Sequence, residues 1–303
     1  MPKRRLRSFG LALAVFALVA AACSNNSSSS GTTGSTGSTG ASASPANDLL
    51  SHIMASGVLR VATDPKYPPQ SSYDTATGTW KGFDIDVATE IAKRMGLKVQ
   101  WVTPPWDSII SGHWQDRWDL SVGSMTITPD RAKVLDFTPP YYYTPAGLAV
   151  YKTDTQITSP ADLSGKKVGS CGGCTYQQYL EGTLQIPNYQ INFAVHGAQI
   201  VTYDTDSTAI QDLSLGDCIR LCAVFSAIPT LEAAIKAGKP IKLLGGSLYN
   251  EPLAAAIDKE GQLDPTSFVQ KVSDIINQMH QDGTLTQLSM KWYGTDLTTT
   301  TQG

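Results

Sequence analysis

The segment Val58-Leu-Arg-Val-Ala62, which precedes Thr63-Asp-Pro-Lys-Tyr67, is a short apolar run typical of a buried strand. A helical pattern follows it, with an N-cap expected at Asp84 and a C-terminal stop at Gly96. The apolar residues of this helix recur at helical spacing and predict one buried face: Val87, Ala88, Ile91, Ala92 and Met95. The folded part of the chain is therefore expected to begin with a strand followed by a helix.

The same alternation continues toward the C-terminus. Further strands are predicted at 98–102, 120–123, 167–170, 199–203, 223–225 and 241–244, and further helices at 175–181, 207–215, 229–237, 265–282 and 285–292. Strands that alternate with helices form parallel sheets with crossover helices, which predicts an α/β fold. The Pro-flanked aromatic run from Pro139 to Pro145 interrupts the alternation and suits an extended crossing between two lobes.

The N-terminus carries an export signal. Four basic residues precede a fourteen-residue apolar run at 9–22, which is typical of a secretory signal peptide and too short to span a bilayer comfortably. We therefore predict a signal peptide at 1–22. The run ends in Ala20-Ala-Ala-Cys23, which resembles a bacterial lipobox, so we expect Cys23 to be lipidated. Simple cleavage near Ala22, with Cys23 incidental, is the alternative.

The segment after Cys23 has the composition of a tether. Residues 24–46 are almost wholly Ser, Thr, Gly, Asn and Ala, which cannot bury a core. We predict a flexible tether at 23–52 and a disordered tail at 298–303. Because no other apolar run approaches transmembrane length, the sequence predicts an exported, extracytoplasmic protein that is anchored to the cell membrane as a lipoprotein.

The charge of the mature chain excludes one class of partner. The chain has 23 Lys and Arg against 26 Asp and Glu, and removing the four cations of the signal peptide leaves a net charge of −7. Nucleic-acid binding requires a basic face, so no nucleic-acid partner is expected. The four histidines are scattered, and no cluster of histidines and carboxylates resembles a catalytic site, so neither enzymatic activity nor a cofactor is expected.

Four cysteines remain once Cys23 is assigned to lipid: Cys171, Cys174, Cys218 and Cys222. An even number of cysteines in an oxidising compartment favours disulfides, for which three pairings are possible. Two alternatives stay open. The Cys-x2-Cys and Cys-x3-Cys pairs could together ligate a tetrahedral zinc ion, or the first pair could be a thioredoxin-type redox centre.

A series of motifs runs through the predicted strands and helices. They are Gly57-Val-Leu-Arg-Val-Ala-Thr-Asp64-Pro-Lys-Tyr67, Gly82-Phe-Asp-Ile-Asp86, Gly123-Ser-Met-Thr126-Ile-Thr128-Pro-Asp-Arg131, Leu135-Asp-Phe137 and Tyr141-Tyr142. In this order they resemble the extracellular solute-binding family that serves polar-amino-acid ABC importers, which includes glutamine-, histidine- and lysine/arginine/ornithine-binding proteins. The resemblance extends from about residue 56 to Lys291-Trp-Tyr-Gly294, which is nearly the whole mature body.

The resemblance implies a two-lobed, type II periplasmic-binding-protein-like fold, in which each lobe is a mainly parallel sheet flanked by helices. Two extended hinge strands, near Tyr141–Pro145 and Tyr249–Leu253, would join the lobes. Lobe 1 would be discontinuous, at 53–143 and 252–297, and lobe 2 would cover 146–248. A monomer of this kind would capture a small polar solute that bears a carboxylate, an amino acid or a derivative, by hinge closure and deliver it to an ABC permease with its ATPase.

The resemblance also implies a ligand-binding site centred on Arg131. With Thr128 as N-cap and Pro129 at the first helical position, Arg131 would grip the ligand's carboxylate through two parallel hydrogen bonds. The other implied residues are Asp64 for a polar or cationic head, Tyr67 and Trp106 as aromatic walls, Ser124 and Thr126 for the ammonium and carboxylate, and Gly173, Cys174 and Thr175 on the loop opposite Arg131.

One position departs from the family pattern. Relatives have an Asp that pairs with the ligand's α-ammonium, and this chain has Ala227 there. Either another acid replaces it, with Asp64 as the best-placed candidate, or the ligand lacks an ordinary α-amino group. A desolvated ammonium without a counter-ion would lose a bond of about 1.5–3 kcal/mol.

The family pattern also suggests how the cysteines pair. The segment Ser170-Cys-Gly-Gly-Cys-Thr175 matches the loop that cradles the ligand in relatives, which implies a local Cys171–Cys174 disulfide that stiffens the loop. A Cys218–Cys222 disulfide would stiffen the long approach to the strand at 223–225.

Two other functions remain open. Cyclohexadienyl dehydratases share the implied fold and need an acid of raised pKa in the cleft. The sequence identifies no such acid, and Glu181 is the only nearby acid on the helix after the cysteine pair. A ligand sensor that docks to a membrane receptor is the other alternative, and only its partner would differ.

Overall fold

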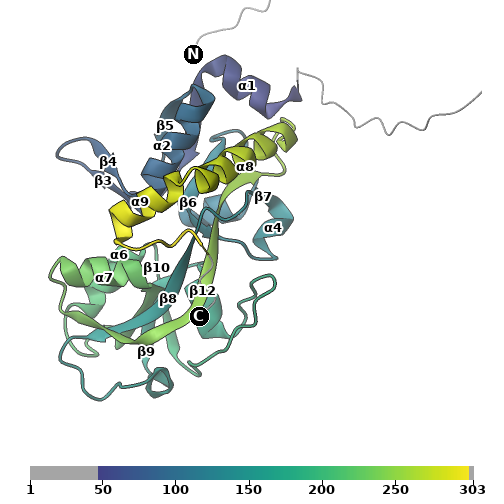
Figure 1. Ribbon diagram of the computed structural model, residues 1–303. Coiled ribbons are helices and arrows are strands. Elements are labelled where there is room, and N and C mark those ends of the chain that lie inside the picture. The colour runs from purple at the N-terminus through teal and green to yellow at the C-terminus, as the bar shows by residue number, and fades with distance from the viewer. Residues whose placement is uncertain (1–46, 300–303) are drawn as a thin grey trace, which may run out of the picture. The chain divides into compact units, whose positions relative to one another are not determined.

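The computed structural model describes residues 47–299 (Figure 1). The predicted signal peptide at 1–22, the lipidated Cys23 and most of the predicted tether lie outside the described residues, as do residues 300–303. Helix α1, Leu49–Ser56, begins inside the range predicted as tether, because Asp48 accepts a 2.9 Å hydrogen bond from the Ser51 amide and caps it. The helices of the described part are all too short or too polar to cross a membrane.

A single large sheet runs through the described residues, with the strand order β10-β9-β11-β8-β12-β6-β1-β5 and with β7 paired to β12. Its strands are β1 Val58–Ala62, β5 Lys98–Val102, β6 Leu120–Thr126, β7 Leu135–Phe137, β8 Tyr142–Tyr151, β9 Lys167–Cys171, β10 Gln199–Tyr203, β11 Ala223–Ala227 and β12 Ile241–Asp258. A second sheet contains β2 Lys66–Tyr67, β3 Ser71–Asp74 and β4 Thr79–Lys81.

The sheet consists of two parallel halves joined by two long antiparallel strands. Strand β1 pairs in parallel with β5 and β6 in lobe 1, and β9 pairs in parallel with β10 and β11 in lobe 2. Strands β8 and β12 lie side by side and run between the halves (Figure 1), with Tyr142 opposite Leu253 and Pro145 opposite Asn250. The predicted α/β fold is confirmed, and the two predicted crossing segments pair with each other.

Helices cover both halves of the sheet. Their bounds are α2 Phe83–Met95, α3 Trp106–Ile110, α4 Arg131–Val134, η2 Pro160–Leu163, α5 Thr175–Glu181, α6 Asp206–Leu213, α7 Ile228–Lys236, α8 Thr266–Gln281 and α9 Thr284–Tyr293. In lobe 1 the buried faces of α2 and α8 pack against β1 and β6, and in lobe 2 α5 packs against β9 and β11. Each lobe therefore has its own hydrophobic core, which lets it move as a unit.

Helix α2 differs from the prediction at its start. Its N-cap is Gly82 and not Asp84, which lies within the first turn and is fully buried. A Cβ at Gly82 would lie 2.1 Å from the Gln70 carbonyl oxygen, so only glycine fits there. The Asp84 carboxylate instead accepts hydrogen bonds of 2.7 Å from the Tyr141 and Ser124 hydroxyls, which ties α2 to the hinge strand and to β6.

Two disulfides join neighbouring cysteines, Cys171 to Cys174 and Cys218 to Cys222, with Cα atoms 5.5 Å and 4.1 Å apart. The pairing implied by the family pattern is confirmed. All four sulfurs are used, so these cysteines offer no thiolate ligands for the alternative zinc site.

The buried Asp84 carboxyl makes the stability of the fold depend on pH. Burial raises its pKa to about 7, so the folded protein holds this proton to a higher pH than the unfolded chain. The resulting stabilisation is largest below the unfolded pKa near 4 and is lost as the pH rises to about 7. We expect the free energy of unfolding of the wild type, relative to that of Asp84→Asn, to fall by about 2–3 kcal/mol between pH 5 and pH 8 in urea titrations.

Asp274 provides the matched control, because it is an exposed aspartate on α8. Asp274→Asn makes the same chemical change at the surface and should not show a pH-dependent difference of that size. A difference between the wild type and Asp84→Asn that stays constant across this pH range would contradict the assignment.

Candidate ligand-binding site

A cavity of about 400 Å³ is lined by both lobes and by the second hinge strand. Lobe 1 contributes the end of β1, the start of α3, the end of β6 and α4, and lobe 2 contributes the loops that follow β9 and β10. Eight of the nine predicted ligand-binding residues line it: Asp64, Tyr67, Trp106, Ser124, Thr126, Arg131, Cys174 and Thr175. Segments far apart in the sequence thus meet around one space large enough for a small solute.

Arg131 is a buried cation in the wall of this cavity, with 5% of its surface exposed. Its guanidinium donates to the Thr126 carbonyl at 2.9 Å and to the Gly173 carbonyl of lobe 2 at 3.0 Å, and lies 5.2 Å from the centre of the Trp106 ring. Burial lowers the pKa of Arg131 to about 10, so it stays charged at neutral pH.

The helix that carries Arg131 begins later than predicted. Arg131 is the first residue of α4, and Pro129 lies before the helix. The N-cap is Asp130 and not Thr128 as predicted, although the Thr128 hydroxyl accepts a 3.3 Å hydrogen bond from the Arg131 amide.

Glu251, on the second hinge strand, is a cavity residue that the sequence analysis missed. It is 1% exposed and accepts hydrogen bonds from the hydroxyls of Thr126 at 2.7 Å, Tyr176 at 2.8 Å and Thr175. Burial raises its pKa, and these three hydroxyls and the charge of Arg131 act in the opposite direction. The Thr126 and Thr175 hydroxyls, predicted to face the ligand, are thus held by Glu251.

Three other predicted residues have protein partners at the edge of the cavity. The Ser124 hydroxyl donates to Asp84, so this side chain points into the core and leaves only the backbone for a ligand. The Tyr67 hydroxyl lies 3.2 Å from that of Tyr176 across the lobes. Asp64 accepts a 2.7 Å hydrogen bond from the Lys66 amide, which fixes its carboxylate at the end of β1.

Gly173 of the disulfide loop was expected to bind the ligand, but it does not line the cavity. Its amide donates to the Gln177 side chain at 2.9 Å and its carbonyl accepts from Arg131, so its polar groups are taken by the protein. A Cβ at Gly173 would lie 2.9 Å from Ile110 of lobe 1, and its φ of 68° is left-handed, so glycine permits this close approach. The loop presents Cys174 and Thr175 to the cavity instead.

Asp206, the first residue of α6, is a second cavity acid that the sequence analysis missed. It is 5% exposed, and burial raises its pKa to about 7. Ala227, the position where the family resemblance predicts an acid, is fully buried at the end of β11. Glu181, the nearest acid in sequence to the disulfide loop, is exposed and does not line the cavity.

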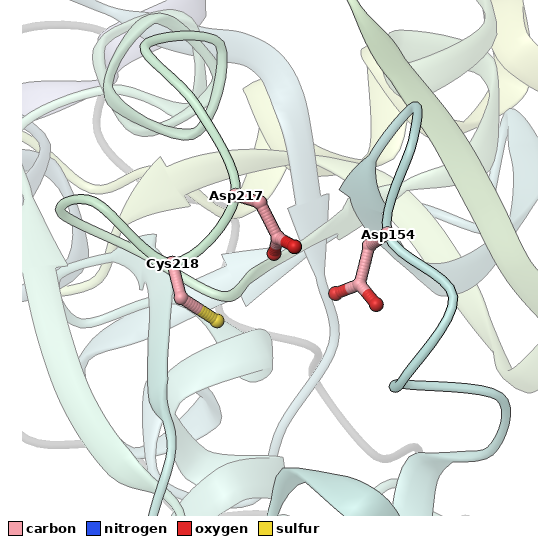
Figure 2. Close-up of side chains that lie close together, drawn as sticks. All are labelled: Asp154, Asp217 and Cys218. Atoms are coloured by element: carbon pink, nitrogen blue, oxygen red, sulfur yellow. The ribbon is translucent and has the colours of Figure 1, made fainter.

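A separate cluster of possible metal ligands joins Asp154, Asp217 and Cys218, and Figure 2 shows the two carboxylates facing each other. Asp154 already accepts hydrogen bonds from two backbone amides, at 2.7 Å and 3.0 Å. The Cys218 sulfur is bonded to Cys222. The Asp154 carboxylate and the Cys218 sulfur are therefore used in contacts within the protein, and the cluster does not indicate a metal centre.

Comparisons with known proteins agree with this geometry. The chain is similar to the L-cystine-binding protein TcyJ of Escherichia coli (strain K12), with 29% identity over 82% of this chain and 88% of that protein. It is also similar to ABC transporter arginine-binding protein 1 of the same organism, with 28% identity over 75% of this chain and 87% of that protein.

A solved structure of an ancestral amino acid-binding protein, described as a precursor of cyclohexadienyl dehydratase, aligns with a TM-score of 0.68 and 32% identity over 80% of this chain and 99% of that one. The named relatives are binding proteins and not enzymes, as predicted for this chain. Residues 59–295 match the family model of bacterial extracellular solute-binding proteins, family 3. The protein therefore belongs to family 3 of the bacterial extracellular solute-binding proteins.

Proposed function

We propose that this protein is the lipid-anchored, extracytoplasmic binding component of an ABC importer, and that it captures an amino acid or a close derivative. The observation that carries the proposal is the buried Arg131 guanidinium in the wall of a cavity lined by both lobes. A buried guanidinium needs an anionic partner, and its fork of donors matches a carboxylate. The names of the relatives, which bind arginine and cystine, support the same solute class.

Hinge closure would bring the ligand-binding groups together. Among the described residues, four side-chain contacts join the lobes: Arg131 with the Gly173 carbonyl, Ser207 with the Lys66 carbonyl at 2.7 Å, Thr230 with Gln70 at 3.1 Å and Tyr67 with Tyr176. Strands β8 and β12 are the paired connections about which the lobes would rotate. The ligand would thus be enclosed by contacts that form only when the lobes meet.

The ligand's carboxylate would take the place of protein acceptors on Arg131. The guanidinium now donates to two carbonyls, which are neutral acceptors, and a carboxylate forms stronger charge-assisted bonds with the same donors. The Trp106 ring beside the guanidinium keeps water from this side of the charge. Cys23 and the tether would hold the protein near its permease, and a monomer suffices because one chain supplies the whole cavity.

Arg131→Gln tests the proposal. The protein is screened by thermal shift against the twenty common amino acids, L-cystine and simple organic acids, since a ligand at 100 times its Kd adds about 2.7 kcal/mol of stability. Loss of the bidentate contact should weaken binding of the best ligand at least about thirtyfold by calorimetry. Arg117→Gln is the matched control: Arg117 also lies over a tryptophan, at 4.8 Å from the Trp118 ring, but outside the cavity.

The proposal fails if no compound with a carboxylate shifts the midpoint of unfolding. It also fails if Arg131→Gln binds the best ligand as tightly as Arg117→Gln does.

The two disulfides allow a second test, because they close loops of similar length but only one borders the cavity. Replacing either pair by serines should lower the free energy of unfolding by about 2 kcal/mol. Only the Cys171→Ser, Cys174→Ser variant should also bind the ligand more weakly, by about threefold to tenfold, because its loop must be ordered on binding. Equal affinities for this variant and the Cys218→Ser, Cys222→Ser variant would show that the first disulfide does not preorganise the site.

A further inference from the structure

The Asp206 carboxylate is a buried acid without a full set of partners. It lies at the start of α6, lines the cavity and is 95% buried, given its 5% exposure. Within the described residues its Oδ1 atom has no hydrogen-bond partner. A buried carboxylate oxygen without a partner is costly, and a group that remains so in a ligand cavity is open to a donor on the ligand.

The charged groups that shift the pKa of Asp206 are carboxylates. Burial raises its pKa most, and the carboxylates of Asp64 and Glu251 raise it further, while only the Ser226 hydroxyl and its own backbone amide act in the opposite direction. Glu251 is different, because three hydroxyls and the charge of Arg131 compensate it. Among these acids, Asp206 thus has the fewest groups that stabilise its charge, and it lines the same cavity as Asp64 of the other lobe.

The opposite ends of an amino acid would find complementary groups in this cavity. Arg131 offers donors for a carboxylate, whereas Asp206 and Asp64 offer acceptors and negative charge for an ammonium. Strand β11 lies close to Asp206, because the Ser226 hydroxyl on this strand lowers the pKa of Asp206. The next residue, Ala227, ends the strand and carries no charge. The polar groups of the cavity therefore match a zwitterion better than a simple acid or a simple amine.

We propose that Asp206 binds the ammonium group of the solute and that the solute is a zwitterion held between Asp206 and Arg131. This inference rests on the proposed function, because it takes the carboxylate site at Arg131 as given. Asp64 supports the same ammonium from lobe 1, so that closure of the lobes completes the site. Selectivity for an amino group then resides on α6 and not on β11.

The test compares Asp206→Asn with Asp204→Asn, using the full exported protein. Asp204 is the matched control, because it lies two residues away and lines the same cavity but is exposed. Each variant is titrated calorimetrically with the amino acid that stabilises the wild type most in the thermal-shift screen, and with the same molecule lacking its α-amino group. For L-glutamine the pair is glutamine and 4-carbamoylbutanoate, and for L-arginine it is arginine and 5-guanidinopentanoate.

We expect Asp206→Asn to weaken binding of the amino acid by about tenfold to a hundredfold and to leave binding of the desamino compound within about twofold. Asp204→Asn should leave both within about twofold. Thermal unfolding of each variant without ligand shows whether it is folded, and Asp206→Glu, which keeps the charge, should bind the amino acid more tightly than Asp206→Asn does.

Two outcomes overturn the inference alone: Asp206→Asn binds the amino acid like the wild type, or it loses the amino acid and the desamino compound equally. In both cases Arg131→Gln would still weaken binding at least about thirtyfold, and the proposed function would stand. If no amino acid binds the wild type, the proposed function and this inference fail together. A variant that does not fold at all would assign Asp206 a structural role and also overturn the inference.

Discussion

The attraction between two buried cavity residues of opposite charge, Glu251 and Arg131, organises the cavity. Either charge alone would be expensive to bury, and the two compensate each other only because hydroxyls and carbonyls satisfy their remaining hydrogen-bonding groups. Thr126 of lobe 1 and Thr175 and Tyr176 of lobe 2 all donate to the same carboxylate on the hinge strand. The Glu251 side chain therefore fixes residues of both lobes relative to the second hinge strand.

This arrangement has a consequence for motion between the lobes. Because Glu251 accepts from hydroxyls of both lobes, opening would separate it from at least one set of donors and bring water to a carboxylate that is now dry. A ligand carboxylate on Arg131 would add a second negative charge beside Glu251, so closure around the ligand needs further positive charge or donors in the cavity. The energetic balance between open and closed lobes thus depends on the charge that the solute brings.

The local sequence pattern predicts most of the helices and strands, because the apolar face of α2 and the apolar runs of the strands depend only on residues close together in the sequence. It failed where a contact joins distant segments. Glu251 and Thr126 are 125 residues apart, and nothing near Glu251 in the sequence shows that three hydroxyls surround it. The helical pattern after Asp84 predicts a cap at that residue, but the N-cap is Gly82, where the Gln70 carbonyl leaves no room for a Cβ. The family resemblance predicted eight residues that line the cavity, but it did not point to Asp206, whose position depends on how α6 packs.

The charge balance of the cavity limits the solutes that it can hold. Arg131 lowers the cost of burying Glu251, whereas the groups that act on Asp206 include the carboxylates of Asp64 and Glu251 and no cation. A simple organic acid would add a further negative charge to this space and gain only the Arg131 contact. A solute that also carries an ammonium gains attraction to Asp206 and Asp64 and relieves their mutual repulsion. The absence of an acid at Ala227 therefore changes which element supplies the counter-ion and does not remove the preference for an amino acid.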